Sequence, residues 1–101
     1  MIEPPAVPDN WSKMYTDPLA STEHGWVTVY DCTRNGQLAQ MEVFWKGSSH
    51  DTVDIHVYEF PSTEPDHEES EAVIKITVPV NEAKQKIDET AEAWITAIDN
   101  E

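Results

Sequence analysis

The side chains of this sequence that could do chemistry are twenty carboxylates, one cysteine and four histidines, and their spacing carries no catalytic signature. The histidines are His24, His50, His56 and His67. None stands in the H-x-x-E-H, H-E-x-x-H or paired Cys/His spacing of a zinc site. The acidic run around His67 lacks the glycine-centred spacing of an EF-hand. We therefore expect no bound metal and no cofactor, and only weakly held monovalent cations at the surface.

The possible nucleophiles also lack the surroundings that catalysis requires. Cys32 has no helix N-terminus or evident base to activate its thiol. Ser48 and Ser49 precede His50, but no nucleophile-elbow or oxyanion signature accompanies them. With only three glycines, the chain has no glycine-rich phosphate loop. We expect no catalytic residues and predict that the protein is not an enzyme.

The strongest structural signal is the stretch from Trp26 to Trp45, in which two β-rich runs flank Asn35-Gly36. This dipeptide favours the type I′ turn of a two-residue hairpin. The turn sets the register, so that Trp26 faces Trp45. Directly opposite residues share a face of the sheet. The apolar set is assigned to the core: Trp26, Thr28, Tyr30, Cys32, Ala39, Met41, Val43 and Trp45.

Two further strands and a helix follow from periodicity. Apolar and polar residues alternate over Thr52 to Phe60 and over Ala72 to Val80, where Pro79 favours an edge strand. Core parity predicts Trp45 opposite Val53, Val43 opposite Ile55 and Met41 opposite Val57. A one-residue slip would place Asp54 against Val43, which burial forbids. Residues 61–71 hold five acids and two prolines, which predicts a solvated loop.

The last element is predicted as a helix over Glu82 to Asn100, with Asn81 as its N-cap. One apolar stripe follows the helical period: Ala83, Ile87, Ala91, Trp94, Ile95 and Ile98. We expect Trp26, Trp45 and Trp94 to meet in the core. Asp99 and Glu101 stand at the negative end of the helix dipole, so the last turn should fray first at low salt.

These elements predict an α+β fold, a four-stranded antiparallel meander with one C-terminal helix packed on one face. Residues 1–23 form a proline-rich, irregular N-terminal arm docked on the sheet, and residues 24–101 form a single ββββα domain. Trp11, Met14 and Tyr15 stand too close together for a purely disordered tail, so we expect the arm to dock.

The sheet face opposite the core, called here the outer face, is too apolar to meet water alone. The predicted register places eight candidate interaction residues there: Val27, Val29, Leu38, Glu42, Phe44, His56, Tyr58 and Phe60. The arm could cover this face, and a second copy of the chain or another protein could do so instead. Glu42 opposite His56, near Asp31 and Asp54, is either a surface charge pair or a small acid–base or ligand site.

Twenty acids against six bases give a net charge of −14 on 101 residues. Such a charge disfavours binding to bare nucleic acid or to an anionic membrane, because both require lysine and arginine. The acids are spread over every segment, and the composition resembles that of small proteins of halophilic archaea. One departure is that lysine outnumbers arginine five to one. The alternative is a DNA mimic that inhibits a nucleic-acid-binding protein.

The function expected from the sequence is therefore that of a small, acidic, non-enzymatic protein acting through protein contacts and adapted to high salt. The partner would be another protein or a second copy of the chain. A lone cysteine on the core face and the absence of any apolar run of about 20 residues favour a cytoplasmic location. The rival interpretations are the DNA mimic and an enzyme or ligand site on the Glu42/His56 face.

Overall fold

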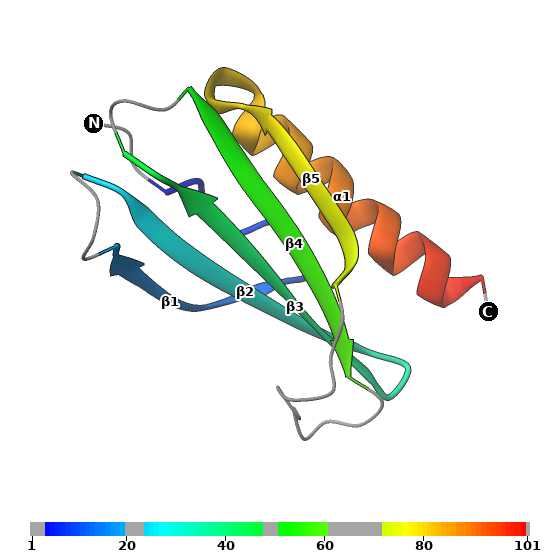
Figure 1. The fold of residues 1–101 in the computed structure, drawn as a ribbon. Helices are drawn as coiled ribbons and strands as arrows, with labels where there is room; N and C mark the ends of the chain where they lie inside the picture. The colour runs from blue at the N-terminus through cyan, green and yellow to red at the C-terminus, as the bar shows by residue number, and fades with distance from the viewer. Residues whose placement is uncertain (1–3, 20–23, 48–50, 61–71, 101) are drawn as a thin grey trace.

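The computed structural model describes residues 4–19, 24–47, 51–60 and 72–100 as an α+β fold. Five antiparallel strands lie in the order β1-β2-β3-β4-β5, and one C-terminal helix, α1, packs on one face of the sheet (Figure 1). The strand and helix bounds are β1 Ser12–Pro18, β2 Trp26–Arg34, β3 Gln37–Trp45, β4 Thr52–Phe60, β5 Ala72–Pro79, the 3-10 turn η1 Val80–Glu82, and α1 Ala83–Asp99. The loop expected over residues 61–71 lies outside the described residues.

The prediction of four strands is wrong, because part of the arm forms β1 at the edge of the sheet beside β2. Tyr15 lies opposite Val29 and Pro18 lies opposite Trp26. The Thr16 and Thr28 hydroxyls share a hydrogen bond of 2.7 Å, and Thr28 Oγ1 also donates to the Tyr15 carbonyl. An edge strand pairs on one side only, so a proline at its end interrupts nothing. The prediction missed this strand because the prolines of residues 1–23 favoured an irregular arm.

The predicted hairpin register is confirmed throughout. Trp26 lies opposite Trp45, and Arg34 lies opposite Gln37 on either side of the turn. Asn35 and Gly36 take φ values of 53° and 78°, as a type I′ turn requires. The predicted β3–β4 pairs also hold, including Val43 opposite Ile55. In β5 the register shifts at Val73, which is the extra residue of a bulge.

The helix keeps its predicted core stripe, but it starts differently. All six stripe residues are buried. Asn81 lies in η1, and the N-cap of α1 is Glu82, which makes no side-chain capping bond. Asn81 is therefore not the cap. The 3-10 turn instead connects Pro79 to the helix and satisfies Val80 N–H through the Asp51 carbonyl.

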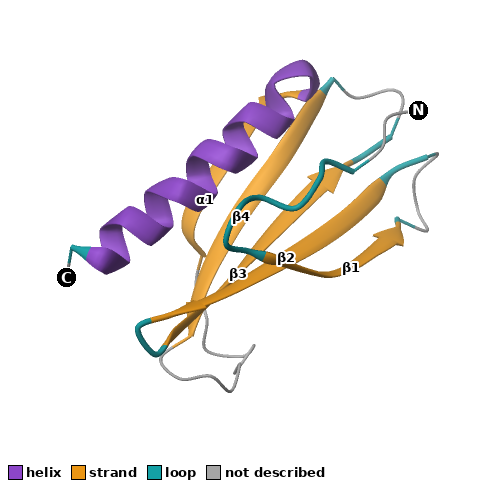
Figure 2. Ribbon diagram, turned by 180° about the vertical axis from the view of Figure 1, so that it is seen from behind, coloured by secondary structure: helices purple, strands orange, loops and turns teal. Residues whose placement is uncertain are grey.

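The arm docks on the same side of the sheet as α1. Trp11 is buried and packs edge-on against Trp94, with ring centroids 5.6 Å apart. The Tyr30 hydroxyl donates a 2.6 Å hydrogen bond to the Pro5 carbonyl, which fixes the arm across the inner face of β2. Figure 2 shows the arm crossing the sheet beside the helix. Of the alternatives left open for the outer face, cover by the arm is therefore not what Pro5 and Trp11 do, since both pack on the helix side of the sheet.

The core lies between the sheet on one side and both α1 and the arm on the other. Trp26 and Trp45 pack together at 6.3 Å between ring centroids, as expected, whereas the aromatic partner of Trp94 is Trp11. Trp94 Nε1 donates to Glu59 Oε1 at 2.7 Å. This bond satisfies a half-buried carboxylate and the buried indole together.

Candidate functional site

The outer face is a platform built from rows of residues that cross the strands. One row runs from Tyr15 on β1 through Val29, Glu42 and His56 to Lys75 on β5. The next row consists of Asp17, Val27, Phe44, Asp54 and Thr77. No helix in the described residues lies on this side, as Figures 1 and 2 show.

The structure separates the eight candidate interaction residues into two groups. Val29, Leu38 and Phe60 are buried, at 2%, 6% and 1% exposure, so their side chains offer little contact area. The remaining five are partly exposed, and they lie together in the middle strands: Val27, Glu42, Phe44, His56 and Tyr58. The accessible part of the predicted surface is thus smaller than expected and centred on β3 and β4.

Three rings form a continuous diagonal on these two strands. The Phe44 and His56 ring centroids are 5.5 Å apart, and those of His56 and Tyr58 are 6.4 Å apart. The Tyr58 hydroxyl reaches His56 Nδ1 at 3.5 Å, the long limit of a hydrogen bond. Burial and the nearby Glu42 carboxylate raise the pKa of Tyr58, so its phenol stays neutral. The three rings, inclined at 58° and 75° to one another, form a partly exposed, amphipathic surface.

The expected Glu42–His56 juxtaposition is present, because the two residues lie directly opposite each other on β3 and β4. Asp54 is occupied by the Thr77 hydroxyl, which donates to its carboxylate at 2.6 Å. Within the ranges described, no group of three or more His, Cys, Asp or Glu side chains could hold a metal ion. His50 and His67 lie outside those ranges.

Cys32 is a core residue, as the hairpin register predicts. Its side chain is buried on the helix side of the sheet. Burial raises the pKa of its thiol, although the neighbouring Arg34 acts in the opposite direction. Because the thiolate is the reactive form, this cysteine is a packing residue.

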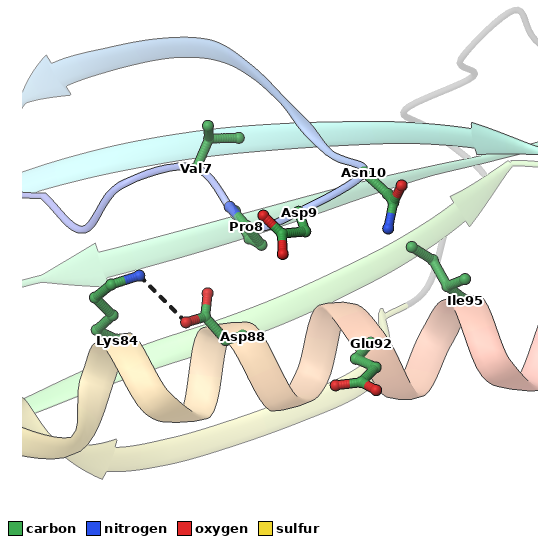
Figure 3. Close-up of a pocket in the computed structure, with 8 residues that line it drawn as sticks. All are labelled: Val7, Pro8, Asp9, Asn10, Lys84, Asp88, Glu92 and Ile95. Atoms are coloured by element: carbon green, nitrogen blue, oxygen red, sulfur yellow. Dashed lines mark hydrogen bonds and ion pairs between the residues drawn. The ribbon is translucent and has the colours of Figure 1, made fainter.

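A separate cavity lies between the arm and α1, on the opposite side of the molecule from the aromatic diagonal (Figure 3). Its volume is about 500 Å³. The arm contributes Val7, Pro8, Asp9 and Asn10, and the helix contributes Lys84, Asp88, Glu92 and Ile95. Lys84 Nζ lies 3.2 Å from Asp88 Oδ2, so the cavity's one cation is paired. The lining is thus mainly acidic around a small apolar floor.

Sequence reasoning missed this cavity because it could not place the arm on a face. The available signal was Tyr30, whose position on the core face requires a partner for its hydroxyl. That partner is Pro5 of the arm, and the contact carries the chain across the inner face of the sheet, beside α1, rather than over the outer face.

Comparison with protein-family models, with curated proteins and with solved structures finds no match. In the described part of the chain, no helix combines the length and the apolar character that a membrane span requires.

Proposed function

We propose that this chain is a non-enzymatic protein that binds another protein through the aromatic diagonal of its outer face, in a cell interior rich in salt. The observation that carries the proposal is that α1 and the described arm both pack on the other face. Phe44, His56 and Tyr58 therefore keep accessible ring surface, although Val29 beside them is buried. Clustered, partly exposed aromatic side chains are typical of binding surfaces.

The charge around the diagonal indicates what partner would fit. Four acids lie on the outer face, and Lys75 is the base among these described positions: Asp17, Asp31, Glu42 and Asp54. Two such faces would repel each other if they met directly. A partner with an apolar centre and lysine or arginine at its rim would be complementary.

The distribution of the acids favours salt adaptation over DNA mimicry. Among the described residues, acids occur on the arm, on β1 to β4 and along α1, rather than in one patch. Dispersed carboxylates suit a surface that must stay hydrated in molar salt. A DNA mimic would need them gathered at phosphate-like spacing. The Glu42–His56 pair supports a ligand or enzyme site less well, because the carboxylate of the neighbouring Asp54 already accepts a hydrogen bond from the Thr77 hydroxyl.

The test is site-specific photo-crosslinking in an extract of the native host, followed by binding measurements with the purified partner. A photoreactive phenylalanine analogue replaces Phe44, and a control places it at Met14, which is also exposed but lies at the β1 bulge. We expect a discrete crosslinked protein from position 44 alone. The double variant Phe44→Thr/Tyr58→Thr should weaken binding of that protein at least about tenfold.

The matched variant Met14→Thr removes a similar exposed apolar group and should bind as the wild type does. Equal crosslinking from both positions, or full affinity of the double variant, would remove the outer face as the binding surface. Circular dichroism of each variant verifies that the fold is kept. Threonine retains the strand preference at both positions.

A further inference from the structure

The two edges of the sheet differ in the charge that they present to another strand. Both edges carry a bulge and a terminal proline, which are usual means of limiting strand pairing. The β1 edge also carries Lys13 and the acid Asp17. The β5 edge has Lys75 as its one charged side chain and no acid. Of the two described edges, β5 is therefore the one at which a negatively charged chain meets less repulsion.

The side of α1 next to β5 is also free of acids. Lys84, Asp88 and Ile95 line the cavity toward the arm, and Figure 3 shows β5 on the other side of the helix. At 100° per residue, four residues point away from the arm: Lys86, Thr90, Ala93 and Ala97. Ala93 and Ala97 are exposed. We call β5 together with these four helix residues the β5 edge surface.

The β5 edge surface stands out because of what it lacks. Each of β1, β2, β3 and β4 carries at least one acid, and α1 carries Asp88, Glu89, Glu92 and Asp99. The β5 edge surface carries two lysines and no acid, although Lys86 Nζ lies 3.3 Å from Glu89 Oε2 on the adjacent side of α1. Ile74 and Ile76 are only partly buried there, although they pack against the core. Among the described residues, the free edge of β5 and these apolar side chains thus coincide with a surface whose own residues include no acid.

We propose that two copies of this chain pair through β5, antiparallel about a two-fold axis normal to the sheet, to form one continuous ten-stranded sheet. The charge of −14 opposes every approach of two copies that brings acids together. Contact through the β5 edge surface reduces this repulsion, because none of its own residues is acidic. The pairing also gives partners to the edge backbone groups of β5, which pair with no other described strand. Small residues at Ala93 and Ala97 allow the two α1 helices to lie side by side on the same face.

The register follows from symmetry and charge. A two-fold axis normal to the sheet pairs residues of the same face, so one residue lies opposite itself. Centring on Lys75 would place two ammonium groups opposite each other, which is unfavourable. Centring on Ile76 places Ile74 opposite Val78 and Lys75 opposite Thr77. The second register covers the partly exposed isoleucines and separates the lysines. It leaves both outer faces open, so the dimer does not depend on the function proposed above.

The first experiment measures the mass of the full chain by sedimentation equilibrium in about 0.2 M and about 2 M KCl, where screening differs. We expect a mass of twice 11.5 kDa in high salt. Ala93→Glu adds an acid to the β5 edge surface and should weaken dimerisation at least about tenfold by like-charge repulsion. Thr96→Glu adds the same charge at an exposed position on another side of α1 and should change it less than about twofold. Ala97→Glu repeats the test if Ala93→Glu fails to fold.

The second experiment tests the register by cysteine trapping in a Cys32→Ala background. Oxidation should link the chains of Ile76→Cys far more completely than those of Ile74→Cys, with little linkage of Met14→Cys at the other edge. Both β5 variants keep Lys75. A monomer at every salt concentration, or equal weakening by the two glutamate variants, would overturn the dimer. Preferential linkage through position 14 would overturn the choice of edge, and equal linkage through positions 74 and 76 would overturn the register.

Discussion

Arg34 and Asp99 join the turn end of the β2–β3 hairpin to the last turn of α1 through two parallel hydrogen bonds. Arg34 Nε lies 2.8 Å from Asp99 Oδ1, and the second guanidinium nitrogen lies 2.9 Å from Oδ2. The single arginine of the chain thus pairs with the last turn of the helix. Sequence reasoning treated Asp99 as an unfavourable acid at the negative end of the helix. The structure corrects this, because the carboxylate is held by a bidentate partner 65 residues away.

The Arg34–Asp99 pair predicts a pH-dependent contribution to stability. Hydrogen bonding to Arg34 lowers the pKa of Asp99 below its ordinary value. A carboxyl group whose folded pKa is depressed stabilises the fold above its unfolded pKa, and that stability is lost as the pH falls through the folded pKa. Asp99→Asn should therefore lower the melting temperature modestly at neutral pH, with the difference vanishing in acid. Both groups are about 40% exposed, so the effect should also shrink in high salt.

The matched control for Asp99→Asn is Glu92→Gln, which makes the same change in net charge at an exposed position of α1. Hydrogen exchange of the last helical turn gives a local readout, which should accelerate in Asp99→Asn alone. Identical pH profiles for the two variants would show that net charge, and not the pair, accounts for the effect.

Gly36 predicts a backbone effect that can be separated from packing. An added Cβ would meet nothing within 4 Å, but the residue has φ +78°. Gly36→Val should therefore cost more than about 1 kcal/mol of unfolding free energy, because a β-branched residue resists this conformation. Gly36→Asn, which tolerates φ > 0, should cost clearly less in the same urea titration. Equal losses would mean that conformational strain at the turn is not the cause.

Trp11 predicts how much the arm contributes to the fold. Its side chain is 5% exposed and packs against Trp94. Trp11→Ala should therefore lower the free energy of unfolding by on the order of 3–5 kcal/mol. Trp11→Phe should cost less, since Nε1 of Trp11 is buried and finds no acceptor among the described residues. Tyr15→Ala, at a position 46% exposed on β1, serves as the control. A Trp11→Ala loss no larger than that of Tyr15→Ala would mean that the arm is not part of the core.

Salt should raise the stability of the whole fold. The radius of gyration is 13.5 Å, and the Debye length falls from about 30 Å at 0.01 M to about 3 Å at 1 M, so screening removes most repulsion among the acids. We expect the melting temperature to rise steeply with KCl up to molar concentrations. The last turn of α1 should not be the first part to fray, because low salt strengthens its bond to Arg34.

Salt also strengthens hydrophobic burial, so the salt titration needs a control at low pH, where the carboxylates are protonated. The salt dependence should be much weaker there. A melting temperature that stays flat between about 0.05 M and 2 M KCl at neutral pH would contradict the proposed salt adaptation. The excess of acids would then point to a specific basic partner.

The sequence by itself determined the hairpin, its register and the core stripe of the helix. Asn35-Gly36 permits few local conformations, and strict alternation makes a one-residue slip bury Asp54. These constraints act between neighbours in the chain or across one turn, so they can be derived without tertiary information. The candidate residues Phe44, His56 and Tyr58 shared a face for the same reason.

Only the tertiary structure decided where the arm lies and which surfaces remain open. Trp11 indicated that the arm docks on the sheet. Its partner Trp94, however, lies 83 positions further along the chain, and no local interaction selects one face of the sheet. The same holds for Arg34 with Asp99 and for the hydroxyl of Tyr30 with Pro5. Such contacts depend on how the packed layers meet in three dimensions. By placing the arm beside α1, they leave the rings of Phe44, His56 and Tyr58 partly exposed and β5 as an edge strand of the described sheet.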